Sequence, residues 1–362
     1  MPDFSQISEF DESLKLLSPG TKFREGLENI LRAETGALIV VGDSEEVLGI
    51  VDGGFNINAK LSPQKLYELA KMDGAIVLSS DAERILCANA QLVPDPSLDS
   101  EETGTRHRTA ERVAKQTGEL VIAISQRRDV ITLYKEGKKY VLEDIRVILV
   151  KANQAIQTLE KYRNVLDQAL TNLSALEFED LVTISDVATV LQRTEMVLRI
   201  GREIEKYINE LGSEGRLINM QLEELVANVR EEGLLIVKDY KVDDLEEGEI
   251  EDPEVIFDKI SNCSSDELLS LSTISKYLGH GGNMSALDLS ISPRGYRLLK
   301  KIPRVPMSVI ENIVSSFENF HEILNASIEE LDDVDGVGDV RAQAIKEGLK
   351  RLRDQVLLDR HI

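Results

Sequence analysis

The chain has 362 residues, of which 42% are hydrophobic, and it carries a formal net charge of −23. This length predicts two or three domains, and the apolar content is sufficient for real hydrophobic cores. The negative charge argues against non-specific nucleic-acid binding by the molecule as a whole, so any contact with DNA must come from a local basic surface or from backbone amides.

Several sequence features bear on the compartment and the redox state. No apolar run approaches the ~18 residues of a membrane span, so we expect no membrane partner. Acidic residues appear early and no basic segment precedes an apolar one, which argues against a signal peptide. The two cysteines, Cys87 and Cys263, are far apart in sequence and have no metal-ligand spacing. A reduced, cytoplasmic protein is the simplest prediction.

Residues 1–145 are expected to form an α/β domain. Apolar periodicity predicts helices at 11–17 and 21–33, and Ser62 followed by Pro63 predicts a helix that ends near residue 72. Short apolar runs predict strands at residues 36–42, 47–51, 75–79, 84–93, 120–125 and 130–134. Strands interspersed with helices in this way predict a mixed central sheet covered by helices.

Residues 146–288 are expected to form an all-α bundle. From about Asp144, apolar residues recur every three or four positions, which is the spacing of buried helix faces. Such a bundle most simply acts as a spacer between two domains. The segment 241–258 is dense in aspartate and glutamate and contains Pro253, so we expect it to be an exposed connector.

Residues 289–362 are expected to form a small all-α domain. Helices are predicted at about 308–317 and 320–324, a capping box begins at Ser327, and a last helix ends near Leu352. Upstream lies a basic segment without acidic residues, whose charges are Arg294, Arg297, Lys300, Lys301 and Arg304. This segment either contributes to nucleic-acid binding or is the polar face of an amphipathic stretch, and the residues alone leave both interpretations open.

The segment from Gly104 to Arg112 carries the strongest chemical signal, because it begins a predicted helix. The residues at or near the helix N-terminus are Thr105, Arg106, His107, Arg108 and Thr109. Free N–H groups and the helix dipole favour an anion there. Arginine forks grip phosphate oxygens in pairs, and a histidine donates a hydrogen bond or moves a proton. A solvated charged first turn, with Glu111 and Arg112 in local charge pairs, is the plainer interpretation.

A second signal, Asp73-Gly74-Ala75, lies at a predicted junction of helix and strand. Glycine there is consistent with a plain helix stop. The alternative is that Asp73 holds Mg²⁺ or Mn²⁺ beside a triphosphate and that Gly74 lets the backbone approach a nucleotide. Together with the Arg-His-Arg run, these residues supply what a phosphoryl transfer needs. The chain has no Gly-Lys-Ser/Thr phosphate loop, so it is not a P-loop enzyme.

These two motifs resemble those of the diadenylate cyclase family. Residues 36–40 and 125–130 are similar to the neighbouring segments of that family, and the resemblance extends over nearly the whole chain. It implies that two ATP molecules, bound in two facing domains, condense to cyclic di-AMP with release of two pyrophosphates. Because one domain then holds only half a site, the resemblance implies association, and the family's assembly is a homo-octamer.

The resemblance also implies roles for individual residues. Asp73 would hold the Mg²⁺ or Mn²⁺ and help to activate the attacking hydroxyl, while Arg106, His107 and Arg108 would hold the phosphates as catalytic residues. Leu92 would lie near the adenine. The other residues implied to bind ATP are Gly74, Ala75, Thr105, Thr109, Ser125, Arg127 and Arg128.

A glycine-rich turn, Gly336-Val337-Gly338, precedes the last predicted helix. Exposed N–H groups in such a turn grip a DNA phosphate without reading sequence, and Arg341 and Lys346 would add positive charge. An ordinary pair of helices is the alternative. The resemblance favours a helix-hairpin-helix that binds branched or junction DNA, although nearby aspartates limit its affinity.

The sequence therefore predicts a cytoplasmic, nucleoid-associated diadenylate cyclase whose C-terminal domain binds DNA. By the resemblance, DNA binding lowers the cyclase activity. The alternative is a non-catalytic DNA-binding scaffold with a nucleotide-sensing N-terminal domain. Asp73 separates the two hypotheses, because a pure sensor needs no metal-holding carboxylate at that position.

Overall fold

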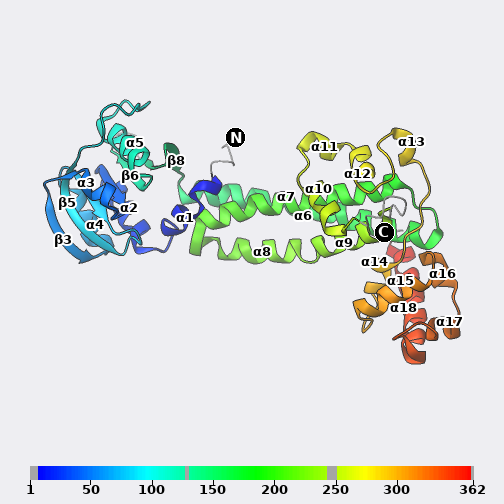
Figure 1. The fold of residues 1–362 in the computed structure, drawn as a ribbon. Helices are drawn as coiled ribbons and strands as arrows, with labels where there is room; N and C mark the ends of the chain where they lie inside the picture. Colours follow the sequence, from blue (N-terminus) through cyan, green and yellow to red (C-terminus); the bar gives the residue numbers. More distant parts are fainter. Residues whose placement is uncertain (1–6, 127–129, 243–250, 360–362) are drawn as a thin grey trace. The chain divides into compact units, whose positions relative to one another are not determined.

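The computed structural model describes residues 7–126, 130–242 and 251–359 (Figure 1). The chain divides into two compact units. The first comprises Met1–Ala155 with Glu203–Gln221, and the second comprises Ile156–Arg202 with Leu222–Ile362. These units differ from the three contiguous domains expected from the sequence because three helices contribute residues to both: Ile145–Glu179, Ile184–Leu211 and Arg216–Val226. The boundaries at residues 145 and 288 stay predictions.

In its described part, the first unit is built on an eight-stranded mixed sheet. The strands are β1 (Ala37–Val41), β2 (Val51–Asp52), β3 (Phe55–Lys60), β4 (Ala75–Leu78), β5 (Arg84–Leu92), β6 (Leu120–Ser125), β7 (Val130–Lys135) and β8 (Lys138–Leu142). Their order is β2-β5-β4-β1-β6-β7-β8, with β3 paired to β5. Among the described pairs, β1 and β4 are parallel and the others antiparallel, which confirms the predicted mixed sheet.

The sheet separates two hydrophobic cores. The helices of this unit are α1 (Ile7–Leu16), α2 (Lys22–Arg32), α3 (Glu45–Gly49), α4 (Pro63–Ala70) and α5 (Thr105–Thr117). Ala37, Ile39 and Val41 of β1 pack in the core that contains α1, α2 and α4. Leu38 and Val40 face the opposite core, under α3 and α5. This alternation within one continuous apolar run is why β1 is buried along its whole length.

The strand predicted at residues 47–51 is wrong, since most of that segment is helix α3. The hydroxyl of Ser44 accepts a hydrogen bond from the Val47 N–H at 3.4 Å and caps the helix. Glu45 and Glu46 then lie in the first turn, where the helix dipole favours negative charge. These N-terminal signals outweigh the β-branched residues, and β2 begins only at Val51.

Two strands of this unit, β3 and β8, were not predicted. Their sequences, Phe-Asn-Ile-Asn-Ala-Lys and Lys-Lys-Tyr-Val-Leu, contain no continuous apolar run. β8 is a terminal strand in the sheet order, and β3 lies off the main path against β5. Edge positions tolerate polar side chains, so they leave little signal in the sequence.

A long helical region follows the sheet, as expected. Its elements are α6 (Ile145–Glu179), α7 (Ile184–Leu211), a 3₁₀ turn (Gly212–Gly215), α8 (Arg216–Val226), α9 (Val229–Tyr240), α10 (Pro253–Ser261), α11 (Ser265–Leu269), α12 (Leu271–Tyr277) and α13 (Met284–Leu287). The expected connector at 241–258 is partly wrong, because Asp252 caps α10 by accepting from the Glu254 N–H at 3.0 Å. Residues 243–250 of that segment lie outside the described residues. No helix within the described ranges has both the length and the apolarity to cross a bilayer.

The C-terminal helices of the second unit enclose their own core. They are α14 (Tyr296–Lys300), α15 (Met307–Ser316), α16 (Phe320–Asn325), α17 (Ile328–Asp332) and α18 (Gly338–Asp359). The predicted capping box is present: Ser327 and Glu330 cap each other's backbone at the start of α17. The last helix continues to Asp359, past its expected end near Leu352.

Candidate functional site

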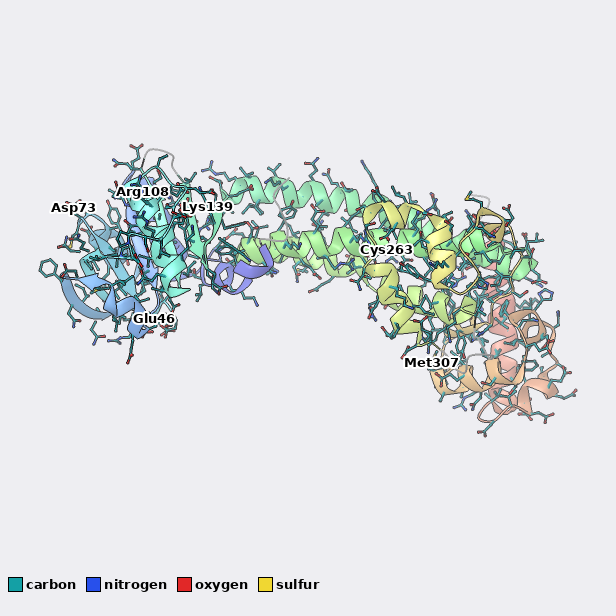
Figure 2. The ribbon with its side chains drawn as sticks, turned by 45° about the horizontal axis from the view of Figure 1, so that its top comes forward. Glu46, Asp73, Arg108, Lys139, Cys263 and Met307 are labelled. Atoms are coloured by element: carbon teal, nitrogen blue, oxygen red, sulfur yellow. The ribbon has the colours of Figure 1, made fainter. Side chains whose placement is uncertain are left out.

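The first turn of α5 carries two arginines, Arg106 and Arg108, of which Figure 2 labels Arg108. Gly104 precedes the helix in an extended conformation and supplies no side-chain cap. Arg106 and Arg108 are exposed. In the part of the chain that the structure describes, neither pairs with a carboxylate, and Arg108 donates only to the carbonyls of Glu102 and Thr103, at 3.3 and 3.4 Å. Backbone N–H groups and positive side chains here favour an anionic ligand.

Arg106 lies against the backbone at the start of β1. A Cβ atom placed on Gly36 would collide with the Arg106 guanidinium. Glycine at this position therefore lets the arginine lie close to the sheet.

The turn that carries Asp73 is fixed against β5. Gly74 has a φ of +89°, and a Cβ there would lie 2.7 Å from the Ala90 carbonyl oxygen. The side-chain amide of Asn89 donates to the Asp73 carbonyl at 2.7 Å. Only glycine fits this close approach. The turn therefore requires glycine at position 74 more strictly than a plain helix C-terminus would. The Asp73 side chain itself is exposed.

Sheet register brings the arginine turn and the aspartate turn to the same edge. Ile39 pairs with Ile76 in the parallel pair β1–β4, so Gly36 and Asp73, each three residues earlier, lie at the same end of neighbouring strands. β6 is antiparallel to β1 and pairs Ala37 with Ile124, which puts Ser125 at this end as well. The structure therefore places Asp73, Ser125 and the contact between Arg106 and Gly36 along one edge.

The remaining predicted nucleotide-binding residues differ in accessibility. Thr105 is exposed and Thr109 is half-buried. The side chains of Ala75 and Leu92 are buried in the core beneath α3 and α5, so Ala75 can meet a ligand only through its backbone. Arg127 and Arg128 lie outside the described residues.

His107 has a different setting from the two arginines beside it. Its ring is half-buried, and Nδ1 lies 2.9 Å from the hydroxyl of Tyr134, a residue of β7 that is 1% exposed. Tyr134 in turn donates to Oε1 of Glu102 at 2.9 Å, and Lys139 of β8 forms an ion pair with the same carboxylate. Partial burial acts to raise the pKa of Glu102, but the hydrogen bonds from Lys139 and Tyr134 outweigh it and hold the pKa below its ordinary value.

The loop before α5 is held by the helix itself. Arg112 donates to the Leu98 carbonyl at 2.7 Å, and Ser100 donates to Glu111 at 2.5 Å. The expected local charge pairs are therefore half right: Glu111 pairs with Lys115 at 2.8 Å, whereas Arg112 is used on the loop. The residues that support His107 could not be predicted from the sequence, because no local motif or periodicity connects positions 102, 134 and 139.

Few carboxylates are available for a metal ion. Among the described residues there is no cluster of three or more His, Cys, Asp or Glu side chains arranged to hold one. Asp73 is an exposed carboxylate at the same end of the sheet as the contact between Arg106 and Gly36. Mg²⁺ is commonly held by one or two carboxylates together with substrate phosphates, so this donor set fits an ion that arrives with a nucleotide.

The C-terminal glycine turn is exposed, but part of its predicted binding set is used internally. Gly336 and Gly338 have φ of +80° and +65°, and the Val337 side chain between them is buried. Arg341 donates to the Gly336 carbonyl at 2.5 Å. Lys346 donates to the Leu324 carbonyl at 2.8 Å. The backbone of the turn is therefore a better candidate for a phosphate contact than Lys346 is.

Three of the basic residues in the segment 294–304 form ion pairs within the protein. Arg297 is 1% exposed and forms a buried ion pair with Glu177 of α6. Lys301 pairs with Glu232 at 3.3 Å and Lys300 with Glu231 at 3.2 Å. Burial of Arg297 excludes this residue from a DNA-binding surface. The segment is not a simple polar helix face either, because Arg297 lies in the core.

Known proteins resemble this chain over almost its full length. A family described as "DisA bacterial checkpoint controller nucleotide-binding" matches residues 24–139, and one described as "DisA bacterial checkpoint controller linker region" matches residues 142–287. "DNA integrity scanning protein DisA" from Carboxydothermus hydrogenoformans is 63% identical over 343 residues, which cover 95% of this chain and 96% of that one. The protein of the same name from Clostridioides difficile is 59% identical over 362 residues, the whole of both chains.

Proposed function

This chain belongs to the DisA family of bacterial checkpoint controllers, and we propose that it is a diadenylate cyclase that condenses two ATP molecules into cyclic di-AMP and two pyrophosphates. The observation that carries this proposal is the single sheet edge that combines Asp73, Gly74 and the Arg106–Arg108 turn. A carboxylate, a close backbone approach and paired arginines are the groups that a nucleotidyl transfer requires.

In this proposal, the nucleotide binds with its phosphates against the first turn of α5. The exposed guanidinium groups of Arg106 and Arg108 hold the triphosphate and stabilise the charge that develops at the α-phosphate. Asp73 holds Mg²⁺ or Mn²⁺, which supplies further neutralisation of phosphate charge when bound. Gly74 lets the backbone approach the nucleotide, and Leu92, which is 8% exposed, meets the base only with the small part of its surface that core packing leaves open.

The proposed reaction needs two copies of the site. Each ATP provides both a 3′-hydroxyl and an α-phosphate, so two bound nucleotides must face each other across two protomers. Exposed apolar residues at the same end of the sheet support such a contact: Met72, next to Asp73 in the chain, is 42% exposed, and Phe55, opposite Ala88 on β5, is 55% exposed. We propose an assembly in which these edges meet and, as the family resemblance implies, we propose that it is a homo-octamer.

The C-terminal helices are proposed to bind DNA through the turn at Gly336–Gly338. Its positive-φ glycines present backbone N–H groups to a phosphate without reading bases, which suits branched or junction DNA. Binding of DNA is proposed to lower cyclase activity and to keep the protein at the nucleoid. The name of the DisA relatives, which refers to scanning DNA integrity, supports this part of the proposal.

Identification of the product tests the proposal against the alternative of a non-catalytic scaffold. Purified full-length protein is incubated with ATP and Mn²⁺, or with ATP and Mg²⁺, and the products are identified by mass spectrometry. We expect cyclic di-AMP with two pyrophosphates for each molecule formed. ATP that is bound but unchanged under both conditions would support the scaffold instead.

A further inference from the structure

We propose that Tyr134 and Glu102 are positioning residues of the nucleotide site, which hold His107 and, through it, the first turn of α5 that carries Arg106 and Arg108. This inference rests on the proposed cyclase function, because it assigns those two arginines to the nucleotide. It adds two residues outside the two sequence motifs. Tyr134 lies well beyond them in the chain and bonds both His107 and Glu102. The Glu102 carboxylate accepts from Tyr134, and its backbone carbonyl accepts from Arg108 at 3.3 Å.

The anchor has a defined geometry. His107 Nδ1 and the Tyr134 hydroxyl are 2.9 Å apart, with the two rings in an edge-on arrangement at a centroid distance of 6.1 Å. Tyr134 is 1% exposed and belongs to the core beneath α5. The His107 Nε2 atom is also buried. The imidazole is therefore directed into the domain, whereas the residues on either side of it are exposed.

Proton counting fixes the direction of each hydrogen bond. A tyrosine hydroxyl has one proton, and an ionised carboxylate can only accept. Since the ion pair with Lys139 favours the ionised form of Glu102, Tyr134 donates to Glu102. Its oxygen must then accept from His107, which requires a proton on Nδ1. The network therefore requires a protonated Nδ1 on His107 and fixes the orientation of the imidazole ring.

The carboxylate at the end of this network is fixed from two sides. Lys139 holds it from β8, an edge strand of the same sheet (Figure 2). The backbone of Glu102 accepts from Arg108 at 3.3 Å, and the preceding loop is tied to α5 by Ser100 and Arg112. Helix α5 thus holds the loop that supplies Glu102, and Glu102 in turn holds, through Tyr134, the first turn of α5.

This arrangement explains why a histidine stands between two arginines. An N-terminal helical turn with two exposed arginines has only weak local restraints, because it has no side-chain cap. A buried hydrogen bond one residue away restricts the turn without occupying the ligand-facing side. Preorganised charges bind phosphate at a lower conformational cost than mobile ones.

Kinetics of a double-mutant cycle test the proposal. Tyr134→Phe keeps the buried ring and removes only the hydroxyl, and His107→Leu removes the donor. We expect each change to raise the KM for ATP by roughly fivefold to tenfold, with a smaller change in kcat. The double variant should be no worse than the poorer single variant, because both remove the same bond. Losses that multiply in the double variant, or an unchanged KM in Tyr134→Phe, would overturn the proposal.

Two further variants separate positioning from other roles. His107→Asn places an amide N–H near the position of Nδ1, so it should retain more activity than His107→Leu, whereas equal losses would contradict an anchor through Nδ1. Tyr162→Phe, on the exposed part of α6, is the matched control and should leave KM unchanged. If wild-type protein forms no cyclic di-AMP, the proposed function fails; if it does and the cycle is additive, only this inference fails.

Discussion

Two segments of this chain contain arginines that differ in burial and in pairing with carboxylates. In residues 106–108 the arginines are exposed at a helix N-terminus, and the described residues give them no carboxylate partner. In residues 294–304, Arg297 is 1% exposed and is neutralised by Glu177, with Glu232 nearby at 3.5 Å. Positive charge in a sequence therefore indicates a ligand site only where the fold leaves that charge unneutralised.

The buried arginine is part of a dense polar cluster. Tyr240 donates to Glu177 at 2.8 Å, and Arg297 donates to the Ser174 hydroxyl at 3.0 Å. Asp239 of α9 accepts from the backbone N–H groups of Gly295 and Tyr296 at 2.7 Å, which caps α14 from another helix. These bonds join the linker helices to the C-terminal helices within the second unit.

The largest effect is expected when the buried partner is removed. Arg297→Met leaves the Glu177 carboxylate buried without its countercharge, which should lower the unfolding free energy by roughly 3–5 kcal/mol. Chemical denaturation followed by circular dichroism measures this loss. The exposed Arg304→Met is the matched control and should change little. Equal stability of Arg297→Met and wild type would contradict the contrast between the two segments.

The exposed arginine should behave in the opposite way. Arg106→Ala is expected to reduce kcat/KM for cyclic di-AMP synthesis by about 10²- to 10³-fold, because it removes a preorganised phosphate contact. Its midpoint of denaturation should stay close to that of wild type, because no described carboxylate loses a partner. If Arg106→Ala were destabilised but fully active, Arg106 would have a structural role and not the phosphate-binding role assigned to it.

A smaller, pH-dependent effect is expected at Asp239. Burial and the Glu177 charge raise the pKa of Asp239 to about 7 in the folded chain, despite the N–H donors and Arg297, which act to lower it. The folded state then binds more protons than the unfolded state between about pH 4 and 7, so stability falls as pH rises through this range. Asp239→Asn should remove this part of the slope, at about 1.4 kcal/mol per pKa unit. An identical slope in denaturation of both proteins would refute it.

The smallest effect is expected at an exposed ion pair of the same basic segment. Lys300 and Glu231 are 3.2 Å apart, and their side chains are 42% and 54% exposed. Solvent screening limits such a pair, so Lys300→Ala should change the unfolding free energy by less than about 1 kcal/mol. If Lys300→Ala lost as much unfolding free energy as Arg297→Met, burial would not explain why the two ion pairs differ in their contribution to stability.

Part of the fold could be predicted because its signals are local. The apolar run of β1 and the Ser62-Pro63 signal before α4 predicted those elements correctly. The polar edge strands β3 and β8 carry no such signal, and the serine cap before α3 outweighed the β-branched residues after it.

The candidate site divides in the same way. Asp73, Gly74 and the Arg106–Arg108 run form contiguous motifs, so their types and spacing identified them. The contributions of Gly36, Glu102 and Tyr134 depend on strand register and on a loop held by α5, and no periodicity records such pairings. Burial of Arg297 was also invisible, because its partner Glu177 lies 120 residues away.

A comparison of ATP binding with product formation in Asp73→Asn separates the metal-holding role of this carboxylate from nucleotide binding. This change removes the carboxylate charge at the sheet edge and leaves Arg106 and Arg108 in place. If this carboxylate holds the metal ion that the transfer needs, the full-length variant should still bind ATP, measured by calorimetry, while cyclic di-AMP falls below detection by mass spectrometry. Synthesis at the wild-type rate by Asp73→Asn would contradict that role.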